Sequence, residues 1–266
     1  MGFLRDDYLS CTGNTLWAVR QLAAATGERI INIPDCPKGP LQYHLADNER
    51  LGLCFPVHGW RVPKIVCEAI SRLDISLKGH YVYSLCTCGD DIGETFDLLR
   101  KQLAAVNIPL HASCSLIMPE TYVGLPFMDV DTPQKEQAKI KASQKILTKF
   151  IDMVVRREPT NYHIITGQAP HLKTRVLGGY FTKRLITDKP FRVDSQRCVK
   201  CGICANVCPI HNILGGAGKE PQWLHNGRCL ACFSCYHHCP QHAIKYGWRT
   251  KGKGQYFFGK RKKNSL

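Results

Sequence analysis

Short apolar runs alternate with amphipathic segments along residues 1–125. A strand candidate ends just before Ser10, although Arg5, Asp6 and Asp7 fit poorly with a buried strand. Four further runs have strand character: Glu28–Ile33, Leu51–Phe55, Tyr81–Leu85 and Leu110–Ile117. Helical periodicity lies between them, at Leu16–Ala25, Lys64–Arg72 and Thr95–Val106. Such alternation predicts an α/β domain, a doubly wound parallel sheet of five strands with helices on both faces.

A longer helix follows this region. Thr132 is a good N-cap and Pro133 suits the first helical position, so we expect a helix from Pro133 to about Arg157. Its apolar stripe of Ile140, Leu147, Ile151 and Val154 would pack on the sheet. The pattern then divides the chain into a domain at 1–157, a linker at 158–192, a cysteine-rich domain at 193–247 and a basic tail at 248–266.

Charge separates the two halves of the chain. Residues 1–150 contain 16 Lys and Arg and 16 Asp and Glu, so their charges cancel. Residues 151–266 contain 20 Lys and Arg but 5 Asp and Glu, and this excess accounts for the whole net charge of +15. A basic half suits an acidic protein, nucleic acid or an anionic membrane surface.

The chain lacks the marks of a membrane or exported protein. No window approaches the roughly 18 uninterrupted apolar residues of a membrane span. The first ten residues have no apolar core of signal-peptide length and include Asp6 and Asp7. We therefore expect a cytoplasmic protein with reduced thiols, in which clustered cysteines bind metal.

Eight of the 15 cysteines form two copies of one pattern, C-x2-C-x2-C-x3-C-P, which begin 31 residues apart at Cys198 and Cys229. A zinc site would use two separated pairs of thiolates, whereas three cysteines at this spacing suit an iron–sulfur cubane. The fourth cysteine, next to proline, ligates the other cluster. One predicted ligand set is Cys198, Cys201, Cys204 and Cys239, and the other is Cys208, Cys229, Cys232 and Cys235.

This region resembles bacterial-type two-cluster ferredoxins over about 50 residues, a small α+β fold. Ile213 and Ile244, each five residues after a proline-adjacent cysteine, match apolar positions that cover the clusters in those domains. His237 and His238 lie inside the second motif, but the cysteines already complete both sets, so we expect these histidines to be exposed.

A second motif stands at the start of the first predicted helix. Ser10-Cys11-Thr12-Gly13-Asn14-Thr15 matches the S/T-x-T-G-x-T phosphate loop of flavodoxins. Backbone N–H groups at a helix N-terminus bind phosphate, and the hydroxyls add donors. The predicted phosphate ligands are Ser10, Thr12, Gly13, Asn14 and Thr15, with Cys11 as a filler at the free position.

Flavodoxin-like sheets bind FMN outside the carboxyl ends of the first and third strands. The loops there contribute the candidate ring contacts Pro56, Val57, His58, Gly59, Trp60, Thr87, Cys88, Gly89, Asp90 and Gly93. Trp60 could stack on the ring or pack in the core, and His58 could face the ring or solvent. The segment Met118–Tyr122 could close over the ring edge. Cys86 and Cys88 could form a redox dithiol, but small packing residues are commoner in such a loop.

As a whole, the sequence resembles ferredoxins that carry an N-terminal flavodoxin domain. The resemblance implies FMN, two [4Fe-4S] clusters and electron transfer between them, without naming a donor or acceptor. The alternative is a flavin-dependent oxidoreductase that acts on a small molecule and is fed by the clusters.

The basic half bears on partners. Two clusters would lower its charge from +15 to about +11, so we expect an acidic redox partner. The tail carries seven Lys and Arg around Tyr256, Phe257 and Phe258. Nucleic-acid binding by stacking on these rings is the rival hypothesis; we favour a solvated or partner-docking tail.

Overall fold

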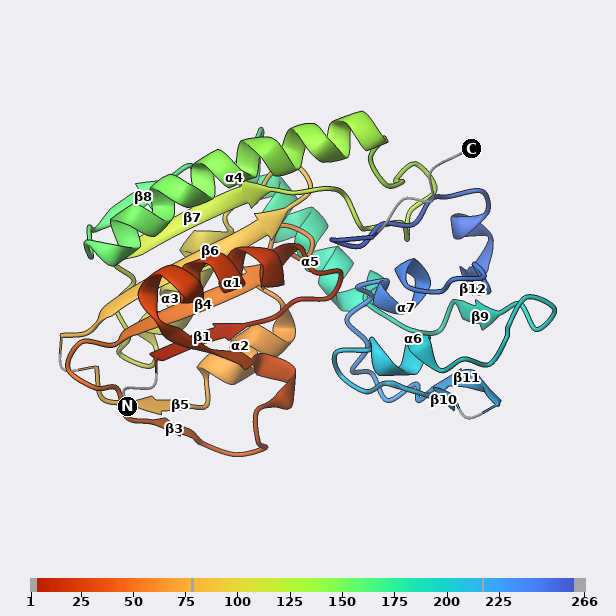
Figure 1. Ribbon diagram of the computed structural model, residues 1–266, viewed down its shortest axis with the longest axis horizontal. Coiled ribbons are helices and arrows are strands. Elements are labelled where there is room, and N and C mark those ends of the chain that lie inside the picture. The colour runs from red at the N-terminus through yellow and green to blue at the C-terminus, as the bar shows by residue number, and fades with distance from the viewer. Residues whose placement is uncertain (1–3, 78, 217, 261–266) are drawn as a thin grey trace.

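Six parallel strands form the central sheet in the computed structural model, which describes residues 4–77, 79–216 and 218–260 (Figure 1). The strand order across the sheet is β2-β1-β4-β6-β7-β8. The bounds are β1 Leu4–Tyr8, β2 Glu28–Asn32, β4 Arg50–Pro56, β6 Tyr81–Cys88, β7 Ala112–Ile117 and β8 Thr160–Tyr162. All neighbouring pairs are parallel, so the predicted α/β class is confirmed.

The predicted count of five strands is wrong, because β8 extends the edge of the sheet. It comes from the segment expected to be a linker, and its three residues, Thr160, Asn161 and Tyr162, are too few and too polar to show strand periodicity. The side chain of Asn161 anchors it, since Oδ1 accepts a hydrogen bond from Ser113 Oγ at 2.7 Å.

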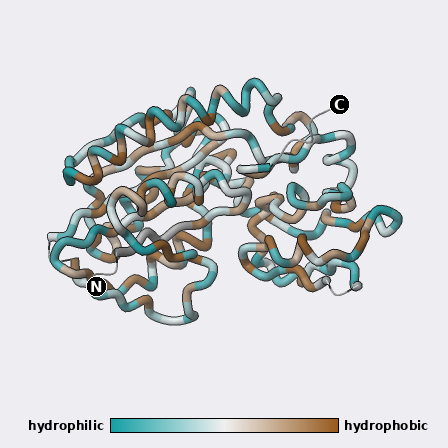
Figure 2. The backbone as a smooth tube through the Cα atoms, in the orientation of Figure 1, coloured by the Kyte–Doolittle hydropathy of each residue, from teal (hydrophilic) through white to brown (hydrophobic). Residues whose placement is uncertain are grey.

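Four helices cover the two faces of the sheet. On one face lie α1 (Asn14–Thr26) and α4 (Pro133–Val155), and on the other lie α2 (Lys64–Ile70) and α3 (Thr95–Ala104). Strand side chains alternate between these faces, as in β6, where Tyr83 and Leu85 pack under α1 and α4 while Val82 and Cys86 pack under α2 and α3. Hydrophobic positions recur between hydrophilic ones along α4 (Figure 2).

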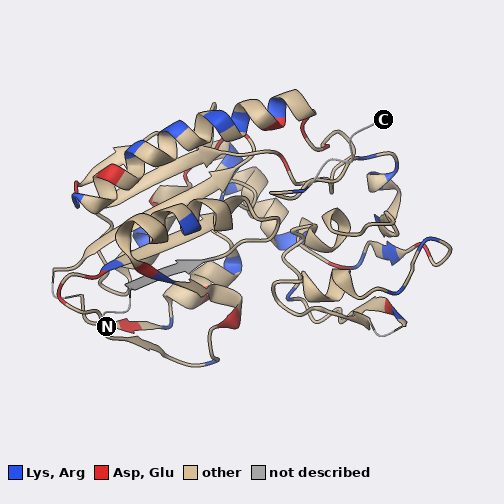
Figure 3. Ribbon diagram, in the orientation of Figure 1, with Lys and Arg blue, Asp and Glu red and all other residues tan. Residues whose placement is uncertain are grey.

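The capping signals of α4 act as the sequence predicts. Thr132 Oγ1 accepts a hydrogen bond from Lys135 N at 3.4 Å, and Pro133 opens the helix. Leu147 and Val154 of the predicted stripe are buried against the sheet. Several Lys residues lie along α4 (Figure 3).

Short elements complete the first part of the chain. A 3₁₀ turn, Ile33–Asp35, follows β2. Two strands that the sequence pattern did not reveal, β3 (Leu41–Tyr43) and β5 (Leu73–Ile75), form a separate parallel pair.

The cysteine-rich part contains two antiparallel strand pairs and two short helices. β9 (Phe191–Val193) pairs with β12 (Ile244–Tyr246), and β10 (Ile213–Gly216) pairs with β11 (Lys219–Trp223). The helices are α6 (Ile203–Asn206) and α7 (Ser234–His237), and the 3₁₀ turn Gly247–Thr250 follows β12.

The 31-residue repeat of the sequence is also a repeat of the backbone. Left-handed φ angles occur at Lys200 and Ala231, at Gly202 and Phe233, and at His211 and His242, always 31 positions apart.

The segment expected to be a linker is ordered structure that packs on both parts. The π-helical turns Leu172–Leu177 and Phe181–Leu185 flank α5 (Gly178–Tyr180). Gly178 lies so close to Gly59 O that a Cβ would overlap it. The ring of Tyr122 meets those of Phe181 and Phe233, with centroids 5.1 and 5.3 Å away. One aromatic cluster therefore joins the sheet loop, the supposed linker and the cysteine-rich part.

The chain's end returns to its beginning. Residues 255–258, here called the C-terminal strap, lie against the loop before α1. Phe258 N donates to Thr12 O at 2.8 Å, and the rings of Phe258 and Trp17 are 5.4 Å apart. Tyr256 is buried. Of the expected solvated or partner-docking tail, the solvated form is therefore wrong for this stretch, because Tyr256 is buried and Phe257 and Phe258 are half-buried. Residues 261–266 lie outside the described part.

No helix in the described ranges is long and apolar enough to cross a membrane.

Candidate functional site

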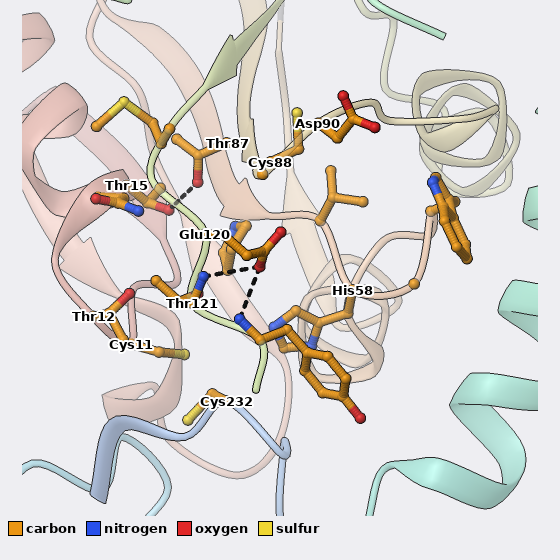
Figure 4. Close-up of a pocket in the computed structure, with 18 of the residues that line it drawn as sticks. Cys11, Thr12, Thr15, His58, Thr87, Cys88, Asp90, Glu120, Thr121 and Cys232 are labelled. Carbon is orange, nitrogen blue, oxygen red and sulfur yellow. Dashed lines mark hydrogen bonds between the residues drawn. The ribbon is translucent and has the colours of Figure 1, made fainter. Parts of the chain in front are cut away.

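A cavity of about 300 Å³ opens at the carboxyl ends of β1, β4, β6 and β7 (Figure 4). We call it the sheet cavity. Its predicted lining residues are Ser10, Thr12, Asn14, Thr15, Pro56, Val57, His58, Gly59, Trp60, Thr87, Cys88, Gly89 and Asp90. The structure also places Met118–Tyr122 in the wall. Because the strands are parallel, loops from distant parts of the sequence meet at this edge.

The loop before α1 has the geometry of an anion site. Gly13 caps the helix in the left-handed region, at φ +93°, and the first two residues of α1, Asn14 and Thr15, line the cavity. Thr15 Oγ1 lies 2.8 Å from Thr87 Oγ1, and Ser10 Oγ accepts from Leu16 N at 3.2 Å. The first contact holds the hydroxyl-bearing loop against the end of β6, and the second joins the loop to the first turn of α1.

Two predicted glycines do not line the cavity. Gly13 has a positive φ and packs against Phe258, whose Cβ would lie 3.0 Å from a Cβ at position 13. Its role is therefore to allow this turn and this close contact. Gly93, also at positive φ, sits where a side chain would overlap Thr174 Oγ1 and Trp60. It therefore permits close packing of the π-helical segment, and its approach to a flavin ring stays a prediction.

Trp60 and His58 stand on the loop after β4. Trp60 adopts a left-handed φ of +56° and faces the cavity edge, with Lys173 Nζ 5.8 Å from its ring centroid. His58 lines the cavity, and burial lowers its pKa to about 4, so the ring is neutral near pH 7.

Two acids, the half-buried Glu120 and the buried Asp131, hold the segment Met118–Tyr122. Glu120 Oε1 accepts from Thr121 N and Tyr122 N, both at 2.8 Å (Figure 4). Asp131 Oδ2 accepts from Glu120 N at 2.9 Å and from Lys139 Nζ at 2.6 Å. Gly89 lets the Glu120 carboxylate approach the loop after β6, because a Cβ at position 89 would overlap this carboxylate in its present position.

Cys86 and Cys88, at the end of β6 near this cavity, are both buried. Burial, followed by the charges of neighbouring groups, raises the pKa of Cys88 to about 12 and that of Cys86 well above its usual range. Both stay thiols near neutral pH, which suits the packing role and argues against a reactive dithiol.

Several wall residues escaped the sequence analysis. Lys173 and Phe181 come from the supposed linker, and Leu230, Ala231 and Cys232 come from the second cysteine motif. Cys11, expected only as a filler, faces Cys232 across the cavity edge (Figure 4). A side-chain hydrogen bond with Cys11, together with burial, raises the pKa of Cys232 well above its usual range. These residues are far apart in the sequence, so local sequence patterns cannot predict that they meet at one cavity.

The eight motif cysteines surround two further cavities. The outer cysteine cavity is lined by Cys198, Cys201, Cys204 and Cys239, and the inner cysteine cavity by Cys208, Cys229, Cys232 and Cys235. These groups coincide with the two predicted ligand sets, crossed cysteines included. Ile213 lines the inner cavity and Ile244 the outer one. Among the described residues, no three His, Cys, Asp or Glu side chains are placed to hold a single metal ion.

Backbone N–H groups point at three of the sulfur atoms. Asn212 N donates to Cys208 Sγ at 3.3 Å, and Ala243 N donates to Cys239 Sγ at 3.2 Å, one in each half of the repeat. Ala231 N donates to Cys229 Sγ at 3.4 Å. Such bonds stabilise thiolates and tune the potential of any cluster bound to them.

The expectation that His237 and His238 are exposed is wrong. His237 is buried, with Nε2 2.7 Å from Thr121 O, and its Nδ1 accepts from Tyr256 N at 3.2 Å. His238 is half-buried and stacks on Phe257, with ring centroids 4.2 Å apart. These histidines connect α7 to the loop after β7 and to the strap, contacts that a motif cannot reveal.

Comparison with known proteins supports the cysteine-rich part. Residues 191–240 match the family model of the 4Fe-4S dicluster domain, which agrees with the predicted iron–sulfur domain. No curated protein matches the chain.

Solved structures resemble the chain weakly. A protein described as a flavoprotein from Bacteroides uniformis is 16% identical with a TM-score of 0.33, over 43% of this chain and 92% of that one. Another described in this way, from Bacteroides eggerthii, is 18% identical with a TM-score of 0.34, over 54% and 99%. Rubredoxin oxygen:oxidoreductase from Desulfovibrio gigas is 13% identical with a TM-score of 0.32, over 58% of this chain and 37% of that one. Because these similarities are so weak, we infer the function from the residues that line the cavities.

Proposed function

We propose that this chain is an electron-transfer protein that binds FMN in the sheet cavity and one [4Fe-4S] cluster in each cysteine cavity. When bound, FMN exchanges one or two electrons and each cluster exchanges one, so the three groups can gather single electrons into pairs. The flavin domain would span residues 1–157 and the cluster domain 193–247, with the intervening segment packed on both.

The chemistry of each cavity fits its proposed group. The loop Ser10–Thr15 offers hydroxyls and helix N–H groups to a phosphate, without a Lys or Arg in the loop. The cavity is large enough for a small-molecule cofactor, and neutral His58 and Trp60 border the part of it away from the phosphate loop. The eight thiols fall into two groups of four, each group drawing on both motifs.

The observation that carries the proposal is a shared wall. Leu230 and Cys232 line both the sheet cavity and the inner cysteine cavity. A cofactor in the sheet cavity would therefore be separated from the inner cluster by side chains of a single loop. Ser234 Oγ, which donates to Cys11 O at 2.8 Å, fixes this loop to the phosphate loop.

The first experiment is cofactor analysis of protein purified without oxygen. We expect close to one FMN, eight iron and eight sulfide per chain, and a visible spectrum that contains both chromophores. Zinc in place of iron, or FMN that reconstituted protein fails to retain, would refute the proposal. Turnover measured with a panel of small acceptors and donors tests the alternative, a flavin-dependent oxidoreductase, which requires catalytic rates with at least one of them.

A further inference from the structure

The two cysteine cavities differ in their relation to solvent. Six residues that line the outer cavity are exposed: Val199, Lys200, Cys201, Ile203, Pro240 and Gln241. None of the residues that line the inner cavity is exposed, and Phe191 and Phe233 are among those that bury it. The outer cavity is therefore bordered by exposed residues, whereas only buried and half-buried residues line the inner cavity.

The cavities are also ordered in space. The inner cavity shares Leu230 and Cys232 with the sheet cavity, whereas the outer cavity shares no lining residue with it. The first motif connects the two cavities, since Cys204, within α6, lines the outer cavity and Cys208, four residues later, lines the inner one. The inner cavity therefore lies between the sheet cavity, with which it shares a wall, and the outer cavity, to which the crossed cysteines connect it.

The surface around the outer cavity is apolar at its centre and basic around it. Val199 is 60% exposed, which is unusual for a valine, and Lys200 lies beside it at the cavity mouth. Three positive charges, those of Arg197, Lys245 and Lys260, lie near His242, which stands between the lining residues Gln241 and Ala243. Residues 191–247 contain six Lys and Arg but two Asp and Glu, and one of these acids, Asp194, lies 3.9 Å from Arg197.

We propose that Val199, Lys200, Cys201 and Ile203 form the electron port of this protein, the docking surface for a one-electron carrier protein with an acidic face. The proposal rests on the proposed function and adds the place at which electrons enter or leave the protein. A small apolar centre with a charged rim favours fast, reversible docking of a partner of opposite charge.

Each docking event transfers one electron. The reduced carrier loses one electron at the port and leaves oxidised, and the electron passes from the outer to the inner cluster and then to FMN. Two such events reduce FMN by two electrons, with two protons taken from solvent. The relay runs in reverse when the potentials favour it.

Cross-linking tests the port without any measurement of activity. The holoprotein is mixed with an acidic [2Fe-2S] ferredoxin and treated with a carbodiimide, which joins lysine amines to carboxylates. We expect cross-links at Lys200 and at Lys245, which follows the lining residue Ile244 on β12. Cross-links confined to Lys183, on the segment beside the sheet cavity, or to lysines of α4 would overturn the proposal.

Kinetics of the same pair give a second test. Reduced ferredoxin should bleach the clusters before flavin absorbance changes, and Lys200→Glu should lower the second-order rate about tenfold and reduce its salt dependence. Lys200→Gln, which keeps the side-chain length, should give a smaller loss. Lys145→Glu, the same charge change at an exposed site on α4, should match the wild type within about twofold.

The outcomes separate this proposal from the one on which it rests. Iron and FMN are quantified in every variant, so a protein without FMN still reports on the port through cluster bleaching. Equal rates for Lys200→Glu and wild type, or flavin reduction that precedes cluster bleaching, would refute the port while leaving the cofactors in place.

Discussion

The hydroxyl of Tyr256 donates a hydrogen bond to Oδ1 of Asn14, 2.7 Å away, across 242 positions of the chain. The same Asn14 side chain donates from Nδ2 to Pro119 O at 3.1 Å. One amide thus connects the C-terminal strap, the proposed phosphate loop and the segment after β7. Both ends of the chain take part in one site.

Removal of the Tyr256 hydroxyl should weaken that site. Tyr256→Phe leaves the buried Asn14 oxygen without this donor, at a cost of about 1–3 kcal/mol. We expect lower FMN affinity and a lower free energy of unfolding, measured by flavin titration and denaturant unfolding. Tyr180→Phe, at a ring that is 62% exposed, is the matched control. If both variants bind FMN as the wild type does, the strap does not support the phosphate loop.

Loss of loop hydroxyls should weaken FMN binding directly. Thr12→Val and Thr15→Val each remove a donor from a buried phosphate site, so we expect the dissociation constant to rise about 5- to 150-fold, equivalent to 1–3 kcal/mol. Thr26→Val, whose hydroxyl bonds Leu22 O at the far end of α1, should have no effect on FMN. Iron content should stay unchanged in all three. Unaltered affinity in both loop variants would place the phosphate elsewhere.

The crossed cysteine sets predict which cluster each substitution damages. Cys208→Ser should expose Cys229 and Cys235 to alkylation and leave Cys198 protected, because Cys208 lines the inner cavity. Cys239→Ser should give the opposite pattern. Mass spectrometry after brief alkylation without oxygen locates the unprotected thiols. Exposure of the first-motif cysteines by Cys208→Ser would contradict the crossed arrangement.

Gly89 should tolerate no side chain. Gly89→Ala brings a Cβ against the Glu120 carboxylate, which holds two backbone N–H groups of Thr121 and Tyr122. Overpacking of this kind costs about 1–3 kcal/mol, and FMN affinity should fall with it. Gly179→Ala is the control, because nothing lies within 4 Å of a Cβ there. Denaturant unfolding that ranks the two variants equally would rule out this role of Gly89.

The sequence predicted most of what is periodic or local. The main helices and the parallel strands follow from apolar periodicity, and the start of α4 follows from Thr132 and Pro133, whose capping acts through neighbouring residues only. Strand β8 was missed because three polar residues at a sheet edge have no period to detect. The segment 158–192 looked like a linker because π-helical turns do not follow the usual helical repeat.

The residues of the candidate site also divide into those that a local motif predicts and those that only the fold brings together. Ser10, Thr12 and Thr15 were found because a phosphate loop is a contiguous motif. Leu230 and Cys232 were missed as wall residues of the sheet cavity, because only folding brings them to the loop after β1. His237 was judged exposed because the motif accounts for ligands alone, whereas its burial comes from Thr121 and Tyr256, which are distant in sequence.

The strap has a consequence for biosynthesis. During translation, residues 10–15 leave the ribosome long before residues 255–258 have been made, and the sheet could fold in the meantime. The wall that contains Cys232 and the support from Tyr256 and Phe258 arrive only with the last part of the chain. A nascent or prematurely terminated chain therefore has a phosphate loop without its full enclosure, and the completed site is confined to chains that also carry both cysteine motifs.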